Sequence, residues 1–206
     1  MRTIPREVVI DPVETTRQPL DWINESEMVL SAYLLGLLGD ATYNKQHKTW
    51  RITQANQMWL LTLKDIFTRL GYKSWIYQEG KCRKVYALET TAKFLTKEIN
   101  PRTLGTLAER KAYVRGYFDA EGGVPREATH WMYIQFSQKN KDELKVLSEI
   151  LEKIGIRCGK IHCPSSRIDP DYWRFFIARQ SHQDFIQKIG SWHPRKYRIL
   201  QLRVKI

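Results

Sequence analysis

The stretches LLGLLGD at residues 34–40 and VRGYFDAEG at residues 114–122 decide the fold. Each lies in an apolar segment of helical character, contains a glycine and ends in a carboxylate. Small residues let the backbones of two helices approach closely. We therefore expect these helices to pack side by side, with Asp40 and Glu121 close together at one end of their interface.

The rest of the chain repeats one order of elements twice. Each apolar helix precedes an alternating segment (49–56, then 130–140) and a long amphipathic helix (57–72, then 141–156). Two more alternating runs and a short closing helix follow (73–78, 82–90 and 91–99, then 158–163, 172–180 and 181–190). Gln54 precedes Gln138 by 84 residues, as Gly71 precedes Gly155, which indicates a duplication. The pattern predicts an α+β fold of two pseudo-symmetric αββαββα halves.

Helix-start signals place the boundaries between the halves. Thr106 and Glu109 have the spacing of a capping box, and Asn24 or Ser26 can cap the first apolar helix. We divide the chain into an N-terminal extension (1–24), a first half (25–100) and a second half (101–206).

Composition points to an anionic partner. The 206 residues carry a formal net charge of +12. Residues 1–30 hold three basic and six acidic side chains, so the excess belongs to the remainder. Such a charge favours nucleic acid or an anionic surface. The chain has no long apolar run, no apolar signal core at its start and only three cysteines, from which we expect an intracellular protein outside the membrane.

Two clustered carboxylates imply a cation. Asp40 and Glu121 would repel each other unless a positive ion lay between them. Oxygen ligands suit Mg²⁺, with Mn²⁺ or Ca²⁺ in its place. A divalent metal on a basic surface is suited to phosphodiester hydrolysis.

The two motifs resemble those of the LAGLIDADG homing endonucleases, in the single-chain form with two copies. The match of GYFDAEG is strong, and the first motif departs from the pattern. Gly116 precedes Glu121 by five residues, whereas Gly36 precedes Asp40 by only four. An alignment on the glycines pairs Ala41 with Glu121. An alignment on the acids pairs Leu35 with Gly116, and we prefer it.

The resemblance implies a monomer whose two four-stranded antiparallel sheets form a saddle over double-stranded DNA. Asp40 and Glu121 would be metal ligands and catalytic residues, and each strand would be cut once across the minor groove, leaving 3′ overhangs. No protein partner or membrane is implied. Polar residues early in each long helix, Gln57 and Lys141, would order water at the metal. Basic residues near the end of each half, Lys196 and Arg102, would assist the developing charge, and Asp119 would be structural.

Basic and amide side chains on the strands fit DNA recognition, because Arg and Gln make paired contacts with guanine and adenine. The candidates are Arg51, Gln54, Lys73, Tyr77, Lys81, Arg83, Lys84, Gln135, Gln138, Arg157, Lys160, Arg174 and Arg179.

Two alternatives remain beside a Mg²⁺-dependent, site-specific DNA endonuclease. The first is an inactive LAGLIDADG protein acting as an intron-RNA maturase or DNA-binding regulator. The second is a structural nucleic-acid-binding protein whose acids cap helices or form ion pairs. A separate question concerns Cys158, His162 and Cys163, which could suggest zinc but lack a second ligand pair, so strand-facing thiols are favoured.

Overall fold

The computed structural model describes residues 21–80, 83–127 and 129–204. The α-helices are α1 (Glu27–Gly36), α2 (Gln57–Arg69), α3 (Leu107–Glu121), α4 (Lys141–Lys153), α5 (His182–Lys188) and α6 (Pro194–Val204). The strands are β1 (Ala41–Asn44), β2 (Thr49–Gln54), β3 (Ser74–Gln78), β4 (Tyr86–Thr90), β5 (Gln135–Gln138) and β6 (Trp173–Phe176). Short 3₁₀ helices are η2 (Asp21–Asn24), η3 (Leu37–Asp40), η4 (Pro101–Thr103) and η5 (Arg179–Ser181).

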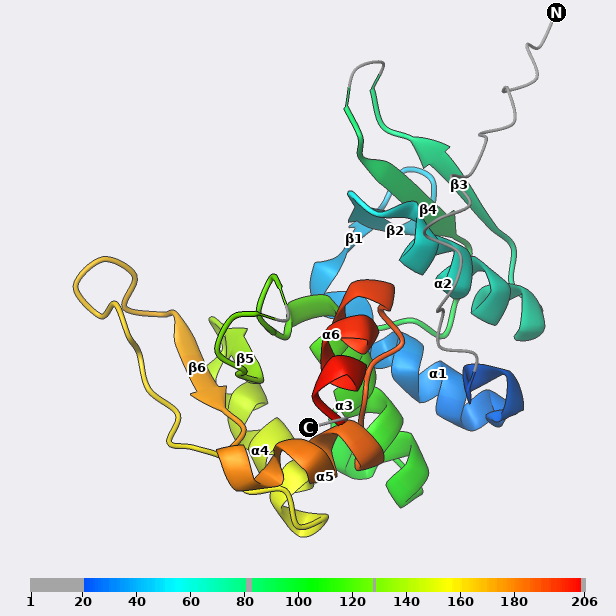
Figure 1. Ribbon diagram of the computed structural model, residues 1–206. Coiled ribbons are helices and arrows are strands. Elements are labelled where there is room, and N and C mark those ends of the chain that lie inside the picture. The colour runs from blue at the N-terminus through cyan, green and yellow to red at the C-terminus, as the bar shows by residue number, and fades with distance from the viewer. Residues whose placement is uncertain (1–20, 81–82, 128, 205–206) are drawn as a thin grey trace, which may run out of the picture.

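Helices α1 and α3 pack against each other at the centre of the molecule, between the parts that carry the two sheets (Figure 1). A Cβ added to Gly36 would run into the carbonyl oxygen of Tyr113, and one added to Gly116 would meet that of Tyr33. The two glycines therefore let the backbones touch, as the motifs predicted. Ser26 caps α1, and the capping box of Thr106 with Glu109 starts α3.

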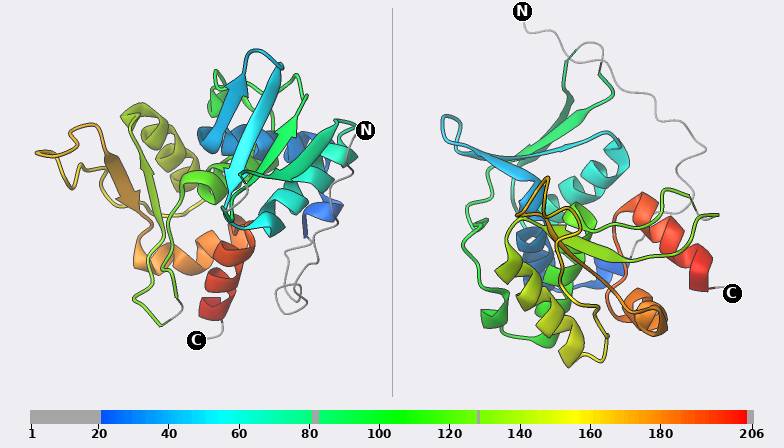
Figure 2. Two further views of the ribbon diagram at one scale, coloured as in Figure 1. Left: turned by 90° about the horizontal axis from the view of Figure 1, so that it is seen from above. Right: turned by 90° about the vertical axis from the view of Figure 1, so that its left-hand side faces the viewer.

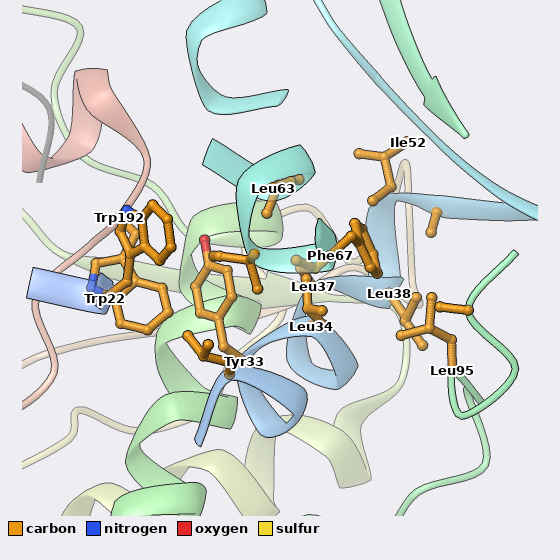
Figure 3. Packing of buried hydrophobic residues seen from close by; sticks show 14 of the residues in the cluster. Trp22, Tyr33, Leu34, Leu37, Leu38, Ile52, Leu63, Phe67, Leu95 and Trp192 are labelled. Carbon is orange, nitrogen blue, oxygen red and sulfur yellow. The ribbon is translucent and has the colours of Figure 1, made fainter. Parts of the chain in front are cut away.

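The first half contains a four-stranded antiparallel sheet in the order β1-β2-β4-β3. Ile52 and Leu88 are paired across β2 and β4 and are fully buried. They join a core that also contains Leu63 and Phe67 of α2, which covers one face of the sheet (Figure 3). The opposite face is left for solvent or a ligand.

The second half keeps the same plan with shorter strands. Strands β5 and β6 form a two-stranded antiparallel sheet, not the four regular strands expected. Isolated bridges stand where the other two strands would lie, joining Gly123 to Gln135, Cys158 to Ile177 and His162 to Arg174. The α+β fold with two related halves is confirmed, and the outer strands of the second half are reduced to these bridges.

The duplication is visible in the helix caps. Helices α2 and α4 both have 13 residues, and their starting points lie 84 residues apart. Asn56 and Asn140 cap them by accepting a hydrogen bond from the backbone N–H two residues on. Both helices end before a glycine with a left-handed backbone, Gly71 (φ 77°) and Gly155 (φ 81°).

Two helix predictions differ from the structure. Residues 91–99 contain no helix, because the hydroxyls of Thr90 and Thr96 accept hydrogen bonds from nearby backbone N–H groups and stabilise turns instead. Helix α6 was not predicted. Its Ile199 and Leu200 lie in the core of the second half, packed beside α5.

The segment before α6 crosses to the first half. Trp192 is fully buried in the same cluster as Leu30 and Tyr33, and its ring lies 4.3 Å from that of Tyr33 (Figure 3). The proposed boundary at residue 100 thus does not separate the two cores completely. Within the described residues, no helix is both long and apolar enough to pass through a bilayer.

Candidate active site

A change of helix type places Asp40 at the end of the first motif. The packing of Gly36 and Gly116 relates α1 to α3 by an offset of 80 residues. Beyond the motifs, the strand pairing gives a different offset. Thr42 pairs with Arg51, and Gly123 bridges to Gln135 in the same way, so Thr42 and Gly123 are equivalent positions that lie 81 residues apart. The glycine alignment thus holds within the helices, where our preferred pairing of Leu35 with Gly116 is wrong. The acid alignment holds from the acids onward.

The 3₁₀ helix η3 absorbs the missing residue. From Gly116 to Glu121 five α-helical residues turn the chain by about 500° and advance it by about 7.5 Å. From Gly36 to Asp40 four 3₁₀ residues turn it by about 480° and advance it by about 8 Å. The tighter helix therefore delivers Asp40 to nearly the position that a fifth α-helical residue would reach.

The two acids lie close to each other at the end of the interface. A Cβ added to Gly39 would lie 2.7 Å from Oε1 of Glu121, so the Glu121 carboxylate rests against the residue before Asp40. Partial burial raises the pKa of Asp40. Burial, followed by the charge of Asp40, raises the pKa of Glu121. The charge of Asp40 thus disfavours the ionised form of Glu121, and a cation between the two carboxylates would relieve this.

Two lysines bring positive charge to the acids. Lys196, in the first turn of α6, is only 4% exposed, and its Nζ donates to the carbonyl oxygens of Phe118 (2.6 Å) and Asp119 (2.8 Å). Burial lowers the pKa of Lys196 to about 8, while the carboxylates around it act in the opposite direction. Exposed Lys97 also lowers the pKa of both acids. Lys97 was missed from the sequence because it falls in the stretch assigned to a helix.

Gln54 contacts the site directly. Its Nε2 donates to Oδ2 of Asp40 at 3.4 Å, and this bond opposes the rise in the pKa of Asp40. The sequence predicts Gln54 as a DNA contact, and its position also lets it orient the acid. The equivalent Gln138 instead accepts a bond from the backbone N–H of Lys139.

Asp119 is structural, as the resemblance implied. It is 1% exposed and accepts from the hydroxyl of Tyr33 (2.8 Å) and the backbone N–H groups of Trp192 (2.8 Å) and His193 (3.1 Å). The Ser191 hydroxyl donates to its other oxygen. Trp59 in turn donates to the Tyr33 hydroxyl. This network fixes residues 191–193, which carry Lys196, onto the helix pair.

For the other predicted catalytic residues, the structure shows contacts with groups other than Asp40 and Glu121, or shows only their position and burial. Lys141 lies with Nζ 4.0 Å from the centre of the Trp173 ring. Gln57 is the first residue of α2 and is partly buried. Arg102 forms an ion pair with Glu149 at 2.7 Å. In the first half, the charge of Lys97 acts on both acids.

The outer face of the first sheet carries a row of side chains across all four strands. Thr42, Arg51, Glu89 and Trp75 are successive partners in the ladder, so they share one face, opposite buried Ile52 and Leu88. Arg51 pairs with Glu79 at 2.6 Å, and the hydroxyl of Tyr77 donates to Glu89 at 2.7 Å. A ligand that used Arg51 or Tyr77 would have to replace these partners.

The outer face of the second sheet is smaller. Gln135 and Arg174 lie opposite the buried Phe136 and Phe175, and the guanidinium of Arg174 lies 5.2 Å from the centre of the Phe176 ring. The remaining candidates lie at strand ends and in connecting segments: Lys73, Arg83, Lys84, Arg157, Lys160 and Arg179. Lys81 falls outside the described residues.

Zinc is not supported by the cysteines. Burial raises the pKa of Cys158 to about 11, and the thiol of Cys163 donates to the carbonyl oxygen of Asp169. Among the described residues, no three His, Cys, Asp or Glu side chains are grouped so as to hold a metal. A metal at Asp40 and Glu121 would therefore take its remaining ligands from water and substrate.

Known proteins share both the domain and the fold. Residues 108–190 match the LAGLIDADG-like domain. Over 93 residues the chain is 36% identical to homing endonuclease I-ApeI of Aeropyrum pernix, a match that covers 45% of this chain and 40% of that protein. The chain thus spans less than half of this curated relative.

Solved structures extend the likeness to both halves. I-DmoI in complex with DNA and Mn is 23% identical with a TM-score of 0.60, covering 80% of this chain and 98% of I-DmoI. Full-length DUF199/WhiA from Thermatoga maritima is 15% identical with a TM-score of 0.61, covering 88% of this chain and 62% of that one. These likenesses show the fold. Residues 108–190 are thus similar in sequence to a LAGLIDADG-like domain, and the fold of the two halves, with its glycine-packed helix pair, is similar to that of I-DmoI.

Proposed function

We propose that this protein is a metal-dependent endonuclease that binds double-stranded DNA and cuts both strands at a specific site. The observation that carries the proposal is the pair of neighbouring carboxylates, Asp40 and Glu121, with Lys196 and Lys97 close enough to influence their charge.

The acid pair fits a divalent cation. Both side chains offer hard oxygen ligands, and both have a raised pKa that a positive ion would counteract. Mg²⁺ usually keeps several waters and takes only one or two carboxylates from the protein, which matches this donor set. Bound there, a metal would supply a nucleophilic water at neutral pH and neutralise charge on the phosphate. I-DmoI has been crystallised with DNA and Mn or Ca, and a variant of it with DNA in the presence of Mg, which supports the same class of ion.

Side chains of the protein would position the two acids and stabilise the charge that develops during the reaction. Gln54 orients Asp40, and Glu121 is held at the end of α3. Lys196 can stabilise the charge that develops on the phosphate, or supply a proton to the leaving oxygen, because its pKa of about 8 is close to neutral. One acid from each half fits one cut on each strand across the minor groove, leaving 3′ overhangs.

DNA would lie over the outer faces of the two sheets, with Arg51, Gln135 and Arg174 directed toward it. The net charge of +12 supports this placement.

The test is cleavage of a DNA library with Mg²⁺ or with EDTA. We expect double-strand cuts at one sequence in Mg²⁺, none in EDTA, and none with Glu121→Gln or Asp40→Asn. Tight binding of a site that the wild-type protein never nicks would favour the regulator or maturase alternative instead.

A further inference from the structure

A hollow lies beside the candidate active site, under the hairpin of β1 and β2. This hairpin projects from the body of the molecule (Figure 2). The hollow has a volume of about 730 Å³ and lies between the hairpin and the segment that follows β4. It is lined by Tyr43, His47, Lys48, Trp50, Thr91, Ala92, Lys93, Leu95, Thr96, Lys97 and Glu98. None of the roles assigned above uses its aromatic lining.

The lining combines aromatic rings with positive charge. The rings of Tyr43 and Trp50 are 5.1 Å apart, and Tyr43 is 44% exposed. Lys48, Lys93 and Lys97 contribute three positive charges against the single carboxylate of Glu98. Aromatic faces that stack on bases, next to lysines that neutralise phosphates, are the usual elements of single-strand nucleic-acid binding.

The fold places a second hollow at the equivalent position of the other half. It has a volume of about 300 Å³ and is lined by Thr129, His130, Trp131, Met132, Arg179 and His182. The strand pairing shows which residues of the two halves are equivalent. Arg51 of β2 pairs with Glu89 of β4, and Gln135 of β5 pairs with Phe176 of β6. Strand β5 thus corresponds to β2 at an offset of 84 residues, and β6 corresponds to β4 at an offset of 87. With these offsets His47 matches Trp131 and Ala92 matches Arg179. Each half thus keeps an aromatic and a basic side chain here, and the larger hollow is the better developed.

Lys97 joins the larger hollow to the acids. It lines the hollow, and its charge also lowers the pKa of Asp40 and Glu121. A strand leaving the acids would therefore meet Lys97 first and then the aromatic rings. Bases in an intact duplex are paired and stacked, so only an unpaired nucleotide could lie against Tyr43.

We propose that this hollow binds the single-stranded end that cutting releases. Its base would stack on Tyr43, and its phosphates would contact Lys48 and Lys93. This inference rests on the proposed function, because the ligand is the product of that reaction. It predicts that the protein holds one cut end after cleavage.

The first experiment measures binding of a short oligothymidine and of an intact mixed-sequence duplex, both in EDTA, by fluorescence anisotropy. Tyr43→Ala and Lys93→Ala should each weaken oligothymidine binding about tenfold and leave duplex binding unchanged. Lys64→Ala, at an exposed position on α2, is the control and should change neither. Ultraviolet crosslinking of the oligothymidine should label Tyr43 or Trp50, as read by mass spectrometry.

Unchanged oligothymidine affinity in both variants, or a crosslink only elsewhere, would overturn the inference. Equal weakening of duplex binding would also overturn it, because the hollow would then contact the uncut target. The two proposals fail separately. A protein that cuts no DNA but crosslinks oligothymidine at Tyr43 loses the endonuclease function and keeps the single-strand site.

Discussion

Glu121 lies where its charge is useful to a metal and unfavourable to the folded chain alone. Burial and Asp40 raise its pKa, so the ionised form is destabilised in the folded state. Glu121→Gln should abolish metal-dependent cleavage and raise the free energy of unfolding by about 1 kcal/mol in EDTA, because the repulsion disappears. Thermal unfolding with and without Mg²⁺ measures this, and Mg²⁺ should stabilise only the wild type. Glu79→Gln is the control, since Glu79 pairs with Arg51 away from the acids. Destabilisation by Glu121→Gln in EDTA would show that the carboxylate is structural.

The same raised pKa values predict opposite pH dependences of activity and stability. A carboxyl whose pKa is raised by folding favours the folded state below its ordinary pKa of about 4, and this contribution is lost as pH rises through the raised value. Metal binding needs the ionised forms of Asp40 and Glu121. Cleavage should therefore fall with decreasing pH before an ordinary carboxylate would protonate. A rate profile that follows an unshifted carboxylate would contradict the geometry.

A substitution of Asp119 measures how much its hydrogen bonds to residues 191–193 contribute to stability. All four groups that contact its carboxylate are donors, so an amide in its place would turn an N–H toward at least one of them. Asp119→Asn should cost about 2 kcal/mol of stability, measured by urea unfolding. Asp184→Asn, at a half-exposed ion pair on α5, should cost much less and serves as the control. Equal costs would mean that the network contributes little.

Among the packed helices, substitutions of two glycines in the motifs should affect stability and cleavage differently. A methyl at Gly116 would meet the rigid backbone of Tyr33, so Gly116→Ala should cost about 3 kcal/mol of stability. A methyl at Gly39 would first meet the flexible side chain of Glu121, which can shift away more easily than backbone. Gly39→Ala should therefore leave the unfolding temperature nearly unchanged and reduce cleavage by displacing Glu121. Calorimetry and a cleavage assay on both variants give the comparison, and a Gly39→Ala protein with full activity would contradict it.

The 3₁₀ helix η3 makes the length of the first motif adjustable by one residue. One leucine inserted between Leu38 and Gly39 can convert η3 to α-helix and keep the acid near Glu121. A second inserted residue would turn the carboxylate a further 100° or so and carry it away. Cleavage should thus persist in part with one insertion and vanish with two. Loss of activity with a single insertion, in a protein that still folds, would show that η3 itself is required.

Sequence patterns predicted the elements well where local chemistry agrees with packing. The caps at Asn56 and Asn140 follow residue preferences that act within one turn of the chain. Residues 91–99 have a helical pattern, but threonine hydroxyls there favour turns. The shift between α-helix and 3₁₀ helix at Gly36 depends on where α3 holds its partner, and no local pattern contains that information.

For the whole molecule, the net charge predicts a strong effect of salt on DNA binding. The logarithm of the binding constant should fall linearly with the logarithm of salt concentration, with a slope of about −0.9 for each phosphate contacted. Lys84→Ala, in the exposed loop between β3 and β4, should make that slope shallower by about 1. Lys64→Ala should leave it unchanged. A slope that does not respond to Lys84→Ala would remove this loop from the interface.

The two acids of the site could be predicted from their motifs. The side chains around them could be predicted only in part. Asp40, Glu121 and Lys196 occupy adjacent positions as the resemblance implied. Gln54 and Lys97 reach the site from a strand end and a turn whose paths depend on the whole first half. Long-range contacts of this kind have no signature in the spacing of residues.

The route of residues 191–196 has a consequence for the order in which the protein is made. Trp192 completes the core of the first half, and His193 lies 5.0 Å from the Trp59 ring, although both residues leave the ribosome long after that half. Lys196 arrives later still. A nascent chain that has emerged only to residue 190 would therefore expose an unfilled place in its first core and lack one of its active-site cations. Maturation of the core and of the catalytic centre would be completed together, in one late step of synthesis.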